Sequence, residues 1–108
     1  MPLFNPEGAI TGAVTVTSGD VTIGTAGNGI NIKEGSNATM GVATLVAGTV
    51  TVSTTAVPAT SRIFLPSQVD GGPPGFVRVS TRTAGVSFVI SSSVADTSNI
   101  AWLIVEPA

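Results

Sequence analysis

The sequence contains no histidine, cysteine or tyrosine, and its only lysine is Lys33. General acid–base catalysis near neutral pH most often uses histidine, so a hydrolase triad would lack its base. A serine–lysine dyad would have to use Lys33, which lies in a polar loop beside Glu34, where nothing activates an amine. Without cysteine there is no disulfide and no thiolate metal site, and the redox compartment stays undetermined. We expect neither an enzyme nor a cofactor.

Charge is also scarce, because only 9% of the residues are charged and the net charge is −2. A typical soluble domain has about 25% charged residues. The lack of a basic cluster argues against nucleic acid as a partner, because that affinity depends on neutralising phosphates. Either a coat of serine and threonine hydroxyls keeps the chain in solution, or other copies or a partner cover part of its surface. We favour the second explanation.

Long apolar segments are missing as well. Residues 1–7 lack the cationic start and the apolar run of a signal peptide. The longest apolar run, Ile100–Val105, has six residues, whereas a membrane helix needs roughly 20. We therefore expect synthesis in the cytoplasm and no membrane partner.

Carboxylates could work as a catalytic pair without histidine, as they do in glycosidases. The candidates all fall in predicted turns, where each has a structural role to fill: Asp20, Glu34, Asp70 and Asp96. Residues 24–29 (Gly-Thr-Ala-Gly-Asn-Gly) resemble a phosphate-binding loop only superficially, because the spacing is wrong and a strand is predicted to follow instead of a helix. These motifs predict turns.

Threonine, valine, glycine and serine are abundant and make up half of the chain. Threonine and valine are β-branched and favour half-buried strands, whereas glycine and serine favour turns. Short alternating segments separated by turns predict an all-β fold, a small antiparallel β-sandwich or barrel. The predicted strands are 14–16, 21–23, 30–32, 42–46, 49–53, 62–65, 76–82, 86–91 and 100–105.

The stretch 41–53 is central to this prediction. Val50 and Val52 alternate with hydroxyl residues, as in a strand with one buried face. Ala47-Gly48 supplies a turn, because glycine readily adopts positive φ. The simplest interpretation is an antiparallel hairpin formed by residues 42–52.

Two later strands carry side chains of special interest. Alternation in residues 76–82 places Val77, Val79 and Thr81 on one side. The other side then carries Phe76, Arg78, Ser80 and Arg82. Its two arginines are open to three interpretations: a binding patch, a solvated face, or an ion pair across subunits. The last strand, 100–105, is apolar on both faces, as a strand covered on both sides would be. Its Trp102 is predicted to lie in the core.

The N-terminal segment has a different composition. Residues 1–12 hold two prolines and two glycines around the pair Leu3-Phe4, which predicts an extended arm. The arm is either a frayed terminus or a segment that orders against a partner. We divide the chain into an N-terminal arm with short β segments, residues 1–36, and an antiparallel β-sandwich domain, residues 37–108.

From residue 29 onward the chain resembles a small β domain that recurs in virion structural proteins of tailed bacteriophages. The residues that carry the resemblance are Gly29–Gly41, Ala43–Val52, Ser61–Leu65, Arg82–Phe88 and Ala101–Pro107, in the same order. In larger phage proteins a similar domain forms a C-terminal module of tail fibres, usually as a trimer. The family has no catalytic residues that could be transferred to these positions.

The resemblance implies a homotrimeric, non-enzymatic capsid decoration or cement protein on the outer surface of the virion capsid, made in the host cytoplasm. It would stabilise the head by bridging subunits of the major capsid protein. A chain with only 28 residues before the similar region is too short for a fibre shaft, which favours the capsid. The predicted capsid contacts, formed by added strand edges and buried side chains of the arm, are Leu3, Phe4, Val14 and Val16.

The alternative is a tail-fibre or receptor-binding tip that contacts a host-surface glycan. It predicts exposed aromatic side chains, of which this sequence has few, with four phenylalanines and one tryptophan. A third class, a glycan depolymerase, would require a pair of carboxylates in one site.

Overall fold

The structure, a computed structural model, describes residues 10–108, apart from the side chains of residues 67 and 68. All paired strands run antiparallel, and residues 10–108 contain no helix. The described chain therefore has no helical segment able to cross a membrane. The strands are β1 (Met40–Thr44), β2 (Thr49–Ser53), β3 (Arg62–Phe64), β4 (Ser67–Val69), β5 (Val77–Thr83), β6 (Ser87–Ser92) and β7 (Asn99–Val105). The predicted all-β, antiparallel fold is confirmed.

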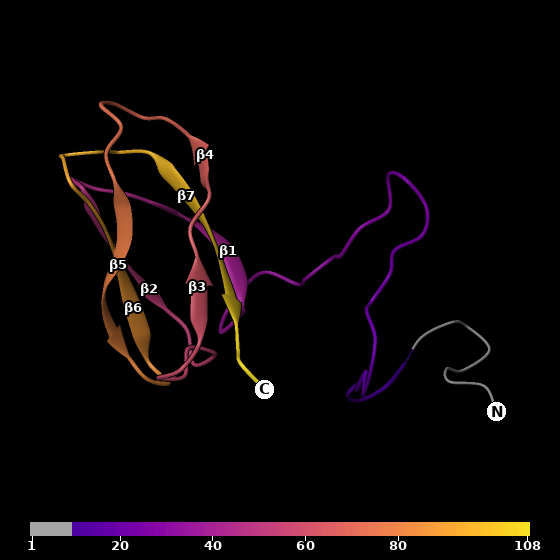
Figure 1. Cartoon of the computed structure of the whole chain (residues 1–108). Coiled ribbons are helices and arrows are strands. Elements are labelled where there is room, and N and C mark those ends of the chain that lie inside the picture. Colours follow the sequence, from indigo (N-terminus) through magenta and orange to yellow (C-terminus); the bar gives the residue numbers. More distant parts are fainter. Residues whose placement is uncertain (1–9) are drawn as a thin grey trace. The chain divides into compact units, whose positions relative to one another are not determined.

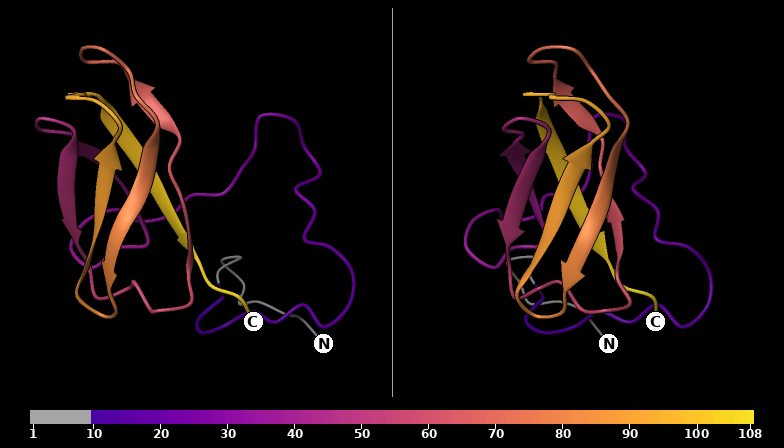
Figure 2. Two further views of the ribbon diagram at one scale, coloured as in Figure 1. Left: turned by 60° about the vertical axis from the view of Figure 1, so that its left-hand side comes forward. Right: turned by 90° about the vertical axis from the view of Figure 1, so that its left-hand side faces the viewer.

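The strands form two sheets that face each other (Figure 1). In the first, here named the β7 sheet, β7 lies between β1 on one side and β3 and β4 on the other. In the second, the β6 sheet, β6 lies between β2 and β5. The right-hand view of Figure 2 looks onto the β6 sheet, with β7 crossing behind it. The fold is thus a small β-sandwich.

The core fills the space between the sheets. Ile100, Trp102 and Ile104 alternate along β7 and are buried, which is the period-2 pattern of a strand with one inward face. They meet Phe88 and Ile90 of β6, and the Trp102 and Phe88 rings stand edge to face with centroids 5.4 Å apart. Aromatic pairs favour this geometry because of their quadrupoles. The prediction that Trp102 lies in the core is confirmed.

The predicted hairpin forms only at its turn. Val46 and Thr49 pair through two backbone hydrogen bonds, of 3.0 and 3.2 Å, around Ala47 and Gly48, which both have positive φ. Beyond this turn the strands separate, since β1 pairs with β7 and β2 pairs with β6. Ala43 of β1 and Val50 and Val52 of β2 therefore reach the core from different sheets, and the interpretation of residues 42–52 as one hairpin in one sheet is wrong.

The three short strands predicted near the N-terminus are also wrong for the single chain. Residues 10–39 contain no strand; the segments 14–16, 21–23 and 30–32 are largely exposed. Each segment offers only two β-branched side chains on one face, which is too little apolar surface to hold an isolated strand. Residues up to Ile30 form a unit of their own, and Asn31–Ala108 form the second unit.

This division leads to a first prediction. A chain that starts at residue 31 should keep the sandwich, with a thermal unfolding midpoint within about 2 °C of the full chain, because a surface change costs little. Residues 37 and 38 have to stay, since the Thr54 hydroxyl donates to the Ala38 carbonyl (2.8 Å) and the Thr55 N–H donates to Asn37 Oδ1 (3.2 Å). Trp102 fluorescence and circular dichroism follow the thermal unfolding of both chains. A chain that starts at residue 41 lacks Asn37 and Ala38 and serves as the destabilised comparison.

Candidate functional site

One end of the sandwich is organised by a buried carboxylate, Asp96, which is 2% exposed. Its Oδ1 accepts hydrogen bonds from the Ser98 N–H (2.8 Å) and the Ser98 hydroxyl (2.5 Å). Its Oδ2 accepts one from the Gly75 N–H (3.2 Å), and its carbonyl accepts one from the Gly48 N–H (2.9 Å). One aspartate thus joins the β1–β2 turn, the loop before β5 and the loop before β7.

These bonds also set the ionisation of Asp96. The hydrogen bond from the Ser98 hydroxyl, supported by the backbone N–H groups of Ser98 and Gly75, holds the pKa of the carboxyl below its ordinary value, while burial opposes the shift. Hydrogen bonds to the charged form favour it. The carboxylate is therefore ionised at neutral pH, with its oxygens occupied by the protein, and its role is to hold loops together.

At the opposite end, Arg82 performs a similar task. Its Nη1 donates to the carbonyls of Ala59 (3.0 Å) and Ser61 (2.8 Å) and, at longer range, to the Pro58 carbonyl and the Ser61 hydroxyl. These acceptors lie in the loop between β2 and β3. The side chain caps that loop and is not available as a binding patch.

A β-bulge explains why alternation in the sequence predicted the wrong face of the strand for Arg82. The register between β5 and β6 shifts between Val79 and Thr81, so that one extra residue, Ser80, interrupts the alternation. Beyond the bulge Arg82 pairs with Phe88, which is buried, and the arginine therefore takes the inner side. The predicted grouping of Phe76, Arg78, Ser80 and Arg82 on one face is wrong for Arg82.

We predict that replacing Arg82 by alanine lowers the free energy of unfolding by about 1–3 kcal/mol, because carbonyls that accept from a charged donor lose it. Arg78→Ala, on the same strand, should change the free energy of unfolding by less than about 0.5 kcal/mol, as exposed substitutions usually do. Urea unfolding followed by Trp102 fluorescence measures both values. Equal effects of the two substitutions would contradict the capping role.

The outward face of the β6 sheet is covered by hydroxyl groups. The residues on the outward side of β2, β6 and β5 are, apart from Val89 and Arg78, all serine or threonine: Thr49, Thr51, Ser53, Ser80, Thr81, Thr83, Ser87 and Ser91. The Ser80 and Ser91 hydroxyls lie 2.7 Å apart and share a hydrogen bond. We name these eight residues, together with Val89 and Arg78, the hydroxyl face.

An aromatic and a cationic side chain stand along the β5 border of the hydroxyl face. Phe76 is 87% exposed, yet its backbone is fixed, because its N–H donates to the Ser93 hydroxyl and its carbonyl accepts from the Ser93 N–H, both at 2.9 Å. Two residues further, Arg78 pairs with Ser91 and is exposed. Alternation places both on the outward side. The alternation in residues 76–82 had placed Phe76 on this side, opposite Val77 and Val79, and that placement is confirmed.

The outward face of the β7 sheet has the opposite chemistry. Met40 and Phe64 both lie opposite Leu103 on β7, and Val42 lies opposite Ala101. Val42, Phe64 and Val105 are 53%, 54% and 44% exposed. We name this surface the apolar face; its residues are Met40, Val42, Phe64, Ala101, Leu103 and Val105. The sequence indicated a strand covered on both sides, whereas in the single chain the outward side of β7 lies between exposed residues.

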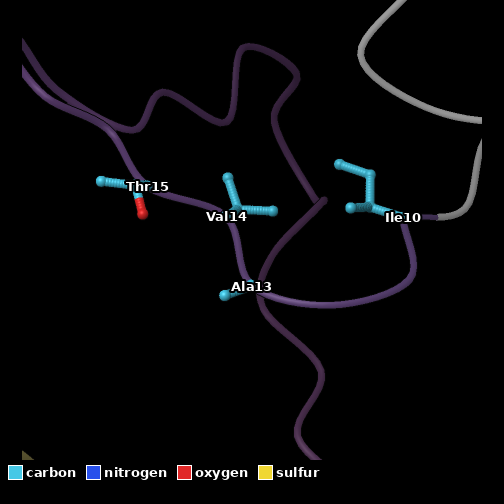
Figure 3. Close-up of a pocket in the computed structure, with 4 residues that line it drawn as sticks. All are labelled: Ile10, Ala13, Val14 and Thr15. Atoms are coloured by element: carbon cyan, nitrogen blue, oxygen red, sulfur yellow. The ribbon is translucent and has the colours of Figure 1, made fainter.

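The four arm residues predicted to contact a capsid are described only in part. Leu3 and Phe4 lie outside the described residues, and Val14 and Val16 are 67% and 48% exposed. A hollow of about 250 Å³ is lined by Ile10, Ala13, Val14 and Thr15, whose side chains Figure 3 labels. All four come from one short stretch, and Thr15 alone among them has a polar side chain. The capsid contact of the arm stays a prediction.

The four carboxylates considered from the sequence differ in burial. Asp20, Glu34 and Asp70 are exposed, whereas Asp96 is buried and hydrogen-bonded. Among residues 10–108 no three acidic side chains gather where they could hold a metal ion.

The fold places this chain among two-sheet antiparallel β-sandwich modules. A sequence model of the K1 capsule-specific polysaccharide lyase C-terminal domain matches residues 37–105, from the asparagine that accepts from Thr55 to the end of β7. The match covers more than half of the chain and all seven strands between residues 40 and 105, and the chain belongs to this family. Comparisons with curated protein sequences and with solved structures give no match. The family is consistent with a phage virion protein domain, and it gives no particular support to a decoration protein.

Proposed function

We propose that this chain is a non-catalytic, polysaccharide-contacting module of a bacteriophage tail spike or fibre. The observation that carries the proposal is the family membership, because the family's name ties this domain to a protein that acts on a capsular polysaccharide. This supports the alternative deduced from the sequence, a tip that contacts a host-surface glycan, better than capsid decoration.

The surface that best fits a polysaccharide is the hydroxyl face with Phe76. Serine and threonine hydroxyls both donate and accept hydrogen bonds, as sugar hydroxyls do. Phe76 offers an apolar ring on a fixed backbone, and a rigid aromatic gives contact area at a low entropy cost. Arg78 adds a cation that can form a bidentate bond to a sugar carboxylate. Apart from Arg78 the face is uncharged, so it is suited to weak, repeated contacts.

The proposal assigns no reaction to the module. Asp96, the buried carboxylate of the described residues, is occupied by Ser98 and Gly75, whereas a catalytic carboxylate needs an environment that leaves it free to exchange a proton. The proposed assembly is a homotrimer, in which symmetry multiplies weak polysaccharide contacts into avidity.

The test is binding of K1 capsular polysaccharide fragments to the full chain by isothermal titration calorimetry, with dextran fragments as the neutral comparison. The fragments are short so that each contacts a single binding surface and avidity does not contribute to the measured affinity. Arg78→Ala should weaken binding by roughly 10- to 150-fold, since one charge-assisted hydrogen bond contributes about 1.5–3 kcal/mol, and Phe76→Ala should weaken it as well.

Arg62→Ala is the matched control, because Arg62 is an exposed arginine at the edge of the other sheet, and it should leave binding unchanged. Absence of binding by the unmodified chain, or an equal loss on changing Arg62 and Arg78, would contradict the proposal.

A further inference from the structure

We infer that the Asn28-Gly29 step is a site of spontaneous modification, at which the folded chain converts its asparagine to aspartate and isoaspartate. This reactivity is independent of polysaccharide binding. The reactants are the asparagine side chain, the backbone nitrogen that follows it, and water. Among residues 10–108 the structure separates this asparagine from Asn31, Asn37 and Asn99, which react more slowly.

The reaction closes a succinimide ring on the backbone. The Gly29 nitrogen attacks Cγ of the Asn28 side chain. A nitrogen–Cγ bond forms, the Cγ–Nδ2 bond breaks, and the proton of the attacking nitrogen leaves with the amide as ammonia. Water then opens the ring. Cleavage of the nitrogen–Cγ bond gives aspartate, whereas cleavage of the bond to the Asn28 backbone carbonyl carbon gives isoaspartate. The reaction consumes water alone and needs no oxidant.

The attacking nitrogen is unhindered. Asn28 and Gly29 are both exposed, and apart from the chain neighbours no atom lies within 4 Å of the position that a Cβ of Gly29 would take. Because glycine has no side chain, the peptide rotates into the attack geometry at low cost. The turn closes one residue earlier, where the Asn28 N–H donates to the Thr25 carbonyl (3.2 Å). Within residues 10–108 no backbone hydrogen bond holds the Gly29 N–H.

Ring closure at Asn37 would require two hydrogen bonds to open. The Thr55 N–H donates to Asn37 Oδ1 (3.2 Å), which fixes the side chain. The nitrogen that would attack it belongs to Ala38, and its N–H donates to the Gly35 carbonyl (3.3 Å). Both reacting groups of this asparagine are therefore occupied by the fold.

Branched residues slow the two other asparagines. Asn31 is exposed and lies outside the strands, but Ile32 follows it, and a β-branched side chain is stiff and crowds the adjacent nitrogen. Asn99 begins β7 and is followed by the fully buried Ile100, and the Thr44 hydroxyl donates to its Oδ1 (2.7 Å). Asn31 is thus the natural comparison, because it differs from the reactive asparagine chiefly in the residue that follows.

Conversion changes the charge and the backbone of the N-terminal segment. The net charge of −2 becomes −3, since one neutral amide turns into a carboxylate, and isoaspartate adds one carbon to the backbone. The new charge lies between Val21, Ile23 and Ile30, which are exposed. A partner that covers these side chains would have to bury a charge, which is costly. Since residues up to Ile30 form a unit of their own, the converted chain should keep the thermal unfolding midpoint of the sandwich.

The test incubates the unmodified full chain in mildly acidic and in mildly alkaline buffer. Ion-exchange chromatography measures the added charge, and peptide mass spectrometry with electron-transfer fragmentation locates aspartate and isoaspartate. Conversion at Asn28 should accumulate with time, and faster in alkaline buffer, because the attacking nitrogen must lose its proton. Asn31 in the same sample should react at least about threefold more slowly, from the backbone freedom of glycine. Gly29→Ala should slow Asn28 by a similar factor.

Ala38→Gly is the matched control, because it creates a second Asn-Gly step at Asn37 with the hydrogen bonds of that site in place. Asn37 should then react at least about fivefold more slowly than Asn28, since two hydrogen bonds must open first. Circular dichroism verifies that Ala38→Gly is folded; if it is not, the comparison of Asn28 with Asn31 in the unmodified chain decides.

Absence of conversion at Asn28, or equal rates at Asn28 and Asn31, would overturn the inference. Equal rates at Asn28 and Asn37 in folded Ala38→Gly would overturn the role assigned to the structure. The result is separable from the proposed function, because conversion is measured without polysaccharide. A chain that converts at Asn28 but does not bind polysaccharide when freshly purified would contradict only the proposed function.

Discussion

Replacing Trp102 by alanine should lower the free energy of unfolding by about 3–5 kcal/mol, the usual cost of removing a large buried aromatic side chain. Trp102 is 6% exposed and packs edge to face on Phe88. It also rests on Gly41 of the neighbouring strand, where an added Cβ would lie 2.7 Å from the indole Cζ2. Since domains of this size have a total stability of about 5–15 kcal/mol, the variant should be only marginally folded.

Thermal unfolding followed by circular dichroism measures this loss, because the variant has no tryptophan to report fluorescence. Val86→Ala removes an apolar side chain that is 57% exposed and should cost less than about 0.5 kcal/mol. Gly41→Ala should destabilise by about 1–3 kcal/mol, as overpacking does. A Trp102→Ala loss no larger than that of Val86→Ala would contradict the placement of Trp102 in the core.

Replacing Asp96 by asparagine should destabilise the chain strongly at neutral pH and much less in acid. Asparagine keeps the shape, but its amide NH₂ would face either the Gly75 or the Ser98 N–H, which are both donors. Because the folded-state pKa of Asp96 lies below its ordinary value, the carboxylate stabilises the fold above the unfolded-state pKa of about 3.9. That contribution is lost as the pH falls through the folded-state pKa.

Urea unfolding of the unmodified chain and of Asp96→Asn between pH 7 and pH 3 tests this linkage. The difference between their unfolding midpoints should be largest at pH 7 and should narrow below about pH 4. Asp70→Asn, in the exposed loop before β5, is the matched control and should unfold at the same midpoint as the unmodified chain. A difference that is independent of pH would show that shape, and not charge, makes Asp96 important.

The strands of the sandwich were largely predictable, because their apolar residues alternate along the sequence. β2, β5, β6 and β7 lie within a residue or two of the expected ranges. β4 was not predicted, since it has three residues, follows Pro66 and pairs with β7 through an irregular register. Local sequence carries little information about a strand that depends on a partner distant in the chain.

The pairing of the strands was not predictable from alternation alone. The pattern around Val50 and Val52 shows which side is apolar, but two apolar strands can lie side by side in one sheet or face to face in two. The choice depends on β7 and β6, which follow more than thirty residues later. The bulge at Ser80 is likewise invisible in the sequence and reverses the side on which Arg82 lies.

The candidate surfaces were predictable only in outline. The shortage of charge indicated either a hydroxyl-coated surface or a covered one. The structure shows a hydroxyl face on the β6 sheet and an exposed apolar face on the β7 sheet. Alternation placed Phe76 on the side opposite Val77 and Val79, where it is exposed. Its hydrogen bonds with Ser93 join residues distant in the sequence and could not be predicted.

The most direct test of the tail-module account is the copy number and position of this chain in purified phage particles. Quantitative mass spectrometry against the major capsid protein, with immunogold labelling, measures both. The account predicts a few copies per particle, labelled at the tail and absent from tailless heads. Hundreds of copies spread over the head, retained when tails are removed, would contradict it and restore capsid decoration.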